Sequence, residues 1–74
     1  MATLRTLECL IAIVDHGSVS AAASALNMSQ PALSYQIAVL EKELGVPVVE
    51  RMRRGVRVTA AGRASAEQAR IALA

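Results

Sequence analysis

A short run of side chains near the middle of the chain could make hydrogen bonds to a partner without carrying charge. Its members are polar or compact: Ser29, Gln30, Pro31, Ser34 and Tyr35. Gln30 can donate and accept, which matches the N6 and N7 atoms of adenine in the DNA major groove, and Pro31 could contact a thymine methyl group. If a helix starts at Gln30, its first backbone N–H groups and Ser29 would suit a phosphate. The simpler interpretation of Gln30 and Pro31 is ordinary helix initiation.

Arginine side chains follow this run closely. Residues 51–63 hold five arginines and no acid, and five of the six acidic residues precede them. The net charge of the chain is only +2, but a cluster of one sign beside a polar, uncharged surface suggests a polyanionic partner. The alternative interpretation is a solvated arginine-rich turn.

The spacing of apolar residues predicts the helices that would position the polar run. A first helix over 3–16, capped by Thr3 and ended by Gly17, would bury one face: Leu4, Leu7, Leu10, Ile11 and Val14. A second helix over 18–26 would bury Val19, Ala22, Ala23 and Leu26.

A turn of Asn27, Met28 and Ser29 would follow, with Asn27 at positive φ. The third helix, over 30–44, would then bury Leu33, Ile37, Leu40 and Leu44. Two helices joined by so short a turn form a helix-turn-helix, which places its second helix in the DNA major groove.

A hairpin and a last helix are expected after Gly45. Residues 46–51 and 56–59 are rich in β-branched side chains and predict two short strands, with Arg53, Arg54 and Gly55 at the tip between them. Thr59 would cap an alanine-rich helix over 60–74, in which Arg63 and Glu67 stand four residues apart. The order of elements is that of a winged helix-turn-helix.

The composition limits the remaining possibilities. A chain of 74 residues makes at most one small domain, and its single cysteine, Cys9, excludes an internal disulfide. Neither a catalytic Ser-His-Asp set nor a phosphate-binding glycine loop is present, so we expect no enzyme, no cofactor and no metal site. The longest apolar run, residues 10–14, is too short to cross a membrane, and no signal peptide is recognisable. We expect a soluble cytoplasmic protein.

The whole chain resembles the amino-terminal domain of LysR-type transcriptional regulators. The resemblance rests on Gly17-Ser18, Ala21-Ala22, Leu26, the run Ser29-Gln30-Pro31-Ala32-Leu33-Ser34, Gln36-Ile37, Leu40-Glu41, Leu44-Gly45, Glu50-Arg51, Thr59 and Ala61-Gly62. It implies a mainly α fold: a winged helix-turn-helix domain over 1–58, with the helix-turn-helix at 18–44 and the wing at 46–58, followed by a linker helix over 59–74. The carboxy-terminal domain with which the family senses a small-molecule inducer is absent from these residues.

The resemblance also implies a function and a set of contacts. The family consists of bacterial regulators that bind promoter DNA as dimers, which often assemble into tetramers. Base-reading positions would be Gln30, Pro31, Ser34 and Tyr35, with Ser29, Arg53 and Arg54 on the backbone or in the minor groove. The linker helix would dimerise through Ala60, Ala64, Ile71 and Leu73. Arg51 has two interpretations, a DNA contact or a structural ion pair with a carboxylate such as Glu41.

Two departures from the family pattern are visible. Many members carry a basic residue where this chain has Tyr35, so a guanine-specific contact by that side chain is in doubt. Leu10, Val19 and Val49 stand where the family often has phenylalanine, which predicts a thinner core. A protein–protein adaptor is the competing function, because helix-turn-helix domains are sometimes used in that way.

Overall fold

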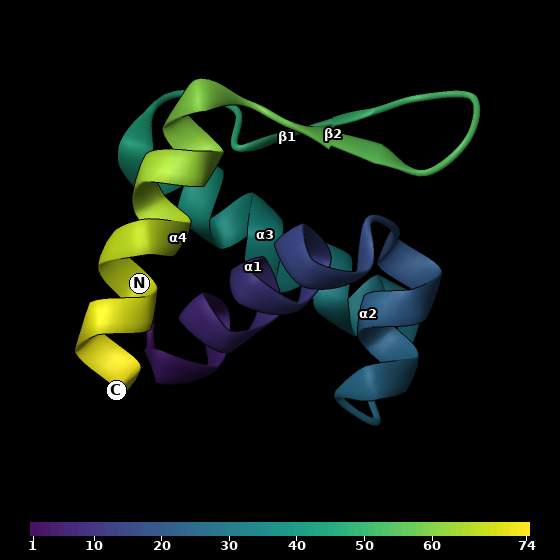
Figure 1. Ribbon diagram of the computed structural model, residues 1–74, viewed down its shortest axis with the longest axis horizontal. Coiled ribbons are helices and arrows are strands. Elements are labelled where there is room, and N and C mark those ends of the chain that lie inside the picture. Colours follow the sequence, from purple (N-terminus) through teal and green to yellow (C-terminus); the bar gives the residue numbers. More distant parts are fainter.

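The computed structural model describes residues 1–74 and has the predicted order of elements. The helices are α1 (Leu4–His16), α2 (Val19–Ala25), α3 (Gln30–Leu44) and α4 (Ala60–Leu73), and the strands are β1 (Val49–Arg51) and β2 (Val56–Val58). α1 runs through the middle of the molecule and packs against the other three helices, while the hairpin crosses one side from α4 towards α2 (Figure 1). The prediction of a winged helix-turn-helix followed by a linker helix is confirmed.

Local capping chemistry sets the helix boundaries. Every helix begins after a hydroxyl side chain that accepts a hydrogen bond from a first-turn N–H: Thr3, Ser18, Ser29 and Thr59. Gly17 and Gly45 end α1 and α3 at φ 74°, and Asn27 has φ 57° in the turn before α3. These boundaries agree with the sequence predictions, and α3 has the predicted bounds.

The core lies where α1 meets α2 and α3. Leu10, Ile13 and Leu33 are fully buried at its centre, and Val48 closes it from the start of the hairpin. The α2 stripe of Val19, Ala22 and Ala23 is buried as predicted, and Met28 packs against the cluster from the turn. The core therefore contains no aromatic side chain.

The predicted buried face of α1 is wrong in part. The fully enclosed residues are Thr6, Cys9, Leu10, Ala12 and Ile13, whereas Leu4 is 63% exposed. α1 is surrounded by three helices, so small residues on several of its sides are covered. In its first turn Thr6 faces the core, whereas Leu4, two positions earlier, points to another side of the helix. Leu44, in the last turn of α3, is also exposed and borders an open hollow with Leu7 of α1 and Ala69 of α4.

The strands of the hairpin are shorter than predicted. Val49 pairs with Val58 and Arg51 with Val56, but Val46, Pro47 and Val48 stay outside the strand. Pro47 has no N–H to donate. The N–H groups of Val48 and Val49 both donate to Glu41 Oε2, at 2.8 and 3.4 Å, so this segment is bonded to α3 before strand pairing begins.

α4 packs along α1 and buries three of its smallest residues, Gly62, Ala66 and Ala69. A Cβ at Gly62 would lie 2.1 Å from the carbonyl oxygen of Val48, so only glycine allows the first turn of α4 to approach the hairpin so closely. Arg70 forms an ion pair with Asp15 at the end of α1. Arg63 and Glu67, which stand four residues apart, form no ion pair.

Candidate nucleic-acid interface

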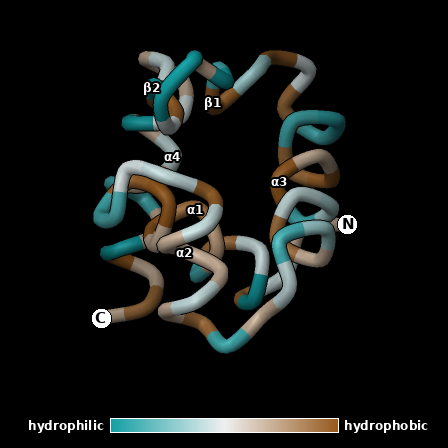
Figure 2. The backbone as a smooth tube through the Cα atoms, turned by 90° about the vertical axis from the view of Figure 1, so that its right-hand side faces the viewer, coloured by the Kyte–Doolittle hydropathy of each residue, from teal (hydrophilic) through white to brown (hydrophobic).

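The outer face of α3 is open to solvent. Leu33, Ile37 and Leu40 hold the opposite face in the core, and Figure 2 shows α3 at one edge of the molecule. Of the predicted contact residues, Ser29, Gln30, Pro31 and Tyr35 are exposed and Ser34 is half-buried. Ser29 Oγ accepts from the Ala32 N–H at 3.2 Å, which fixes the start of the helix. The structure therefore brings the predicted base-reading residues together on one accessible surface.

Sequence reasoning missed two further residues of this face. Ala38 and Lys42 are exposed and continue the row beyond Ser34 and Tyr35, at the spacing that keeps side chains on one side of a helix. The signal was available, since Ala38 follows Ser34 by four residues and Lys42 follows Tyr35 by seven. Lys42 adds the only positive charge within α3.

Arg51 contacts α3 and not the carboxylate that was considered for it. Its Nη2 donates to Ser34 Oγ at 2.8 Å, and no acidic side chain lies within ion-pair distance. The structural pairing with Glu41 is wrong, because the Glu41 carboxylate is occupied by the backbone N–H groups of Val48 and Val49. Arg51 thus belongs to the same surface as Ser34.

The wing presents two arginines without acidic partners. Arg53 and Arg54 are exposed at the tip and form no ion pair. Arg57, in contrast, donates to Glu50 Oε1 at 2.7 and 3.0 Å from directly across the hairpin. The positive charge of the wing that has no acidic partner therefore lies at its tip and at Arg51.

The backbone of the tip is anchored to the turn between α1 and α2. The Val56 N–H donates to the Gly17 carbonyl oxygen at 3.2 Å, and the Met52 N–H donates to Gly55 O at 3.1 Å across the tip. Gly55 has φ 71°, and a Cβ there would lie 2.7 Å from Gly17 O. A glycine at position 55 is thus required for the wing to lie against the helix-turn-helix.

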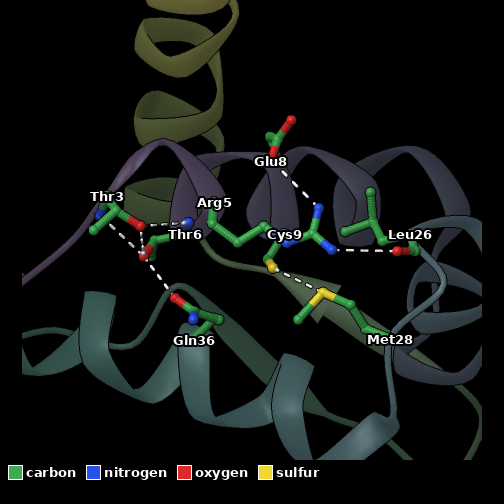
Figure 3. A network of polar contacts seen from close by, with 8 residues as sticks. All are labelled: Thr3, Arg5, Thr6, Glu8, Cys9, Leu26, Met28 and Gln36. Atoms are coloured by element: carbon green, nitrogen blue, oxygen red, sulfur yellow. Dashed lines mark hydrogen bonds and ion pairs between the residues drawn. The ribbon is translucent and has the colours of Figure 1, made fainter.

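A polar network fixes α3 relative to α1 (Figure 3). Thr6 Oγ1 accepts from the Thr3 N–H at 3.1 Å and donates to Gln36 Oε1 at 2.7 Å, although Thr6 is fully buried. This bond joins the start of α1 to the middle of α3. It satisfies the one buried polar side chain of the core, and it sets the distance between the two helices.

The other part of the network joins α1 to the turn before α3. Arg5 Nη2 donates to the Leu26 carbonyl oxygen at 3.3 Å, and Cys9 Sγ lies 3.7 Å from Met28 Sδ (Figure 3). Burial raises the pKa of the Cys9 thiol, which keeps it protonated at neutral pH. Cys9 is thus a small core residue, as expected from the sequence.

The predicted dimerisation residues fall on two sides of α4. Ala60, Ala64 and Ile71 are exposed and share one side of α4 by their helical spacing, and Ile71 is 71% exposed. Ala64 lies at the edge of this side, where it also borders a hollow with Leu7 and Leu40. Leu73 lies on the other side, where it lines a hollow of about 280 Å³ with Ile11 and Leu26. The structure brings three of the four residues into one face and separates Leu73 from them.

The arrangement contains a surface for binding but no group of residues for metal chemistry. No three His, Cys, Asp or Glu side chains lie close enough to hold a metal ion. None of the helices combines the length and apolar character needed to cross a membrane. What remains is an uncharged helix face flanked by Lys42, Arg51 and the arginines of the wing tip.

Comparison with known proteins gives consistent matches. A family model described as bacterial regulatory helix-turn-helix protein, lysR family, matches residues 4–63. The transcriptional regulator ClcR of Pseudomonas putida is 47% identical over 66 residues, which are 89% of this chain and 22% of that protein. The chain thus spans about a fifth of the length of the curated relatives that it matches.

Solved structures with the same fold include protein–DNA complexes. The CbnR_DBD–DNA complex has a TM-score of 0.92 and 44% identity, covering 96% of this chain and 82% of that one. The BenM_DBD complex with catB site 1 DNA has a TM-score of 0.89 and 39% identity, covering 96% and 80%.

Proposed function

Because this chain belongs to the LysR family of bacterial regulatory helix-turn-helix proteins, we propose that it binds double-stranded promoter DNA in a sequence-specific manner. The observation that carries this proposal is the exposed, uncharged face of α3 beside a wing whose tip arginines have no acidic partners. Polar side chains on an exposed helix can reach base edges, and arginines without an acidic partner can bind phosphate. The relatives that the chain matches are regulators, which supports a regulatory role without catalysis.

In this function α3 lies in the major groove. Gln30, Pro31, Ser34 and Tyr35 would meet the base edges, while Ser29 and the first N–H groups of α3 would meet a phosphate. Arg53 and Arg54 would lie on the backbone or in the adjacent minor groove, where a narrow groove concentrates negative potential. The helix is about 22 Å long at 1.5 Å per residue, enough to follow the groove over several base pairs.

The functional unit would be a homodimer formed through α4. Ala60, Ala64 and Ile71 form an exposed face in which alanines allow a second helix to approach closely. A two-fold dimer would place two α3 helices in successive major grooves, about 34 Å apart. This face lacks Leu73, which was predicted to belong to it.

Other properties follow from the family and not from these residues. Any response to a small-molecule inducer, and any assembly into tetramers, would depend on the part of the relatives that this chain does not match. A regulator of bacterial promoters acts in the cytoplasm, which is the location we propose.

The test is titration of duplex DNA at several salt concentrations, after selection of bound sites from a random pool. Arg53→Ala should weaken binding to all sequences about equally, with Arg57→Ala as the matched control because Arg57 is paired with Glu50. Gln30→Ala should instead reduce the preference for the selected site over random DNA. Absence of binding at low salt would refute the proposal and favour an adaptor.

A further inference from the structure

Arg51 is the only arginine that donates a hydrogen bond to a side chain of α3. It projects from β1, and its Nη2 reaches Ser34 Oγ at 2.8 Å, in the middle of the predicted base-reading residues. The other arginines with polar partners contact acidic side chains or the Leu26 carbonyl. The guanidinium of Arg51 is therefore part of the reading face, although its residue lies 17 positions after Ser34.

The pair presents donors rather than acceptors. A guanidinium has five N–H groups and no acceptor, and only one N–H of Arg51 is used by Ser34. A hydroxyl oxygen that accepts from a cation is polarised, so the Ser34 O–H becomes a better donor to a third group. Two adjacent donors of this kind suit two adjacent acceptors.

The DNA major groove offers such acceptors on guanine. Guanine presents O6 and N7 together, whereas adenine and cytosine each present an amino donor at the same edge. Phosphate oxygens share this acceptor chemistry, and arginine binds both. The position of Ser34, between Pro31 and Ala38 on the open face of α3, favours a base edge over the backbone.

α3 itself has no positively charged hydrogen-bond donor near Ser34. Tyr35 offers one hydroxyl and no positive charge, and Lys42, the only cation of α3, lies two turns further on. A positive donor near the start of the reading face can come only from outside the helix. Arg51 meets this requirement.

We propose that Arg51 and Ser34 together donate hydrogen bonds to two adjacent acceptor atoms of operator DNA, and that guanine O6 and N7 are the acceptors that fit them best. This inference rests on the proposed function. Arg51 is held in place at both ends of its strand. Val48 and Val49 are bonded to Glu41, and Val56, the pairing partner of Arg51, is bonded to Gly17. The same bonds occupy the nearby Glu41 carboxylate, so it does not compete for the guanidinium.

The experiment compares Arg51→Gln with Arg57→Gln in the 74-residue chain. Both variants remove one positive charge from the hairpin, but Arg57 is committed to Glu50. On duplexes that carry the selected site, Arg51→Gln should lose about tenfold or more in affinity, and base preference should flatten at one G·C pair. Arg57→Gln should lose much less and keep the preference.

Two further variants test whether the residues act as a pair. Ser34→Ala combined with Arg51→Gln should lose little more than Arg51→Gln alone, because both substitutions remove the same contact. Arg51→Lys keeps the charge but not the planar fork, so it should retain the salt dependence and lose the guanine preference. If thermal denaturation shows that Arg51→Gln is unfolded, Arg51→Lys takes its place in the comparison with Arg57→Gln.

The outcomes show whether the acceptor atoms belong to guanine or to phosphate. Flattened base preference identifies guanine. Uniform loss on all sequences, with a salt slope about one unit smaller than that of the unaltered chain, identifies phosphate. If Arg51→Gln matches Arg57→Gln in affinity, preference and slope, the inference is wrong. If the unaltered chain itself binds no duplex at low salt, the proposed function fails as well.

Discussion

Alanine in place of Gly55 is expected to weaken DNA binding by moving the wing and not by removing charge. A Cβ at this position would lie 2.7 Å from Gly17 O, the atom that accepts the hydrogen bond of the Val56 N–H. Relief of that contact requires the hairpin to separate from the turn between α1 and α2. Arg53 and Arg54, which directly precede Gly55, would move with it.

Gly45→Ala is the matched control for this substitution. Gly45 has nearly the same φ, 74° against 71°, but nothing lies within 4 Å of a Cβ built there. Both variants incur the left-handed strain of about 1–2 kcal/mol. Only Gly55→Ala also loses the Val56–Gly17 hydrogen bond, a net contribution of about 0.5–1.5 kcal/mol. Its free energy of unfolding should therefore fall about 1 kcal/mol further than that of the control.

Denaturant unfolding and duplex titration at several salt concentrations measure the two consequences. If both tip arginines lose their phosphates, the salt slope of Gly55→Ala should be smaller by up to about 2, while Gly45→Ala keeps the slope of the unaltered chain. Equal losses of stability and equal slopes in the two variants would show that the anchoring of the wing does not matter.

Three other substitutions test the remaining parts of the structure. In denaturant unfolding, Thr6→Val should lower the free energy of unfolding by about 1–3 kcal/mol, because the Gln36 amide and the Thr3 N–H lose the hydroxyl that bonds them. Thr6→Ser keeps this hydroxyl and should lose much less. Ala64→Glu should shift the chain towards monomer in sedimentation analysis, whereas Leu73→Gln, on the other side of α4, should not; a persistent dimer in Ala64→Glu would exclude that face. Burial raises the pKa of the Cys9 thiol, so the thiol loses its proton at a higher pH in the folded state than in the unfolded chain. The free energy of unfolding should therefore fall as pH rises through about 8.5 and beyond. Cys9→Ala should remove this part of the pH dependence.

Features encoded by neighbouring residues were predictable from the sequence. Thr3, Ser18, Ser29 and Thr59 cap helices through bonds that span three residues, and Gly17 and Gly45 end them through their own backbone conformation. None of these interactions depends on how the helices pack. For the same reason the start of α3, which carries the predicted base-reading residues, could be placed correctly.

Features that depend on packing could not be predicted in the same way. Apolar spacing alone placed Leu4 on the buried face of α1, although the buried residue of that turn is Thr6 and Leu4 is 63% exposed. The bond between Thr6 and Gln36 joins residues 30 positions apart, and the only signal for it is a polar residue inside an apolar helix. Leu73 was expected on the dimer face, whereas its helical position turns it towards α1.

The net charge of +2 understates the electrostatic character of the proposed DNA-binding surface. Arg5, Arg57 and Arg70 are paired with Glu8, Glu50 and Asp15, so these charges largely cancel away from α3 and the wing tip. Arg63 of α4 has no acidic partner. The other four unpaired cations, Lys42, Arg51, Arg53 and Arg54, lie on α3 or in the hairpin. If each neutralises one phosphate, the logarithm of the binding constant should fall with the logarithm of salt concentration at a slope of about −3 to −4 for one protomer, and about twice that for a dimer. A measured slope near −1 would mean that the free cations do not reach the backbone together, and the wing would then have to be placed away from the DNA.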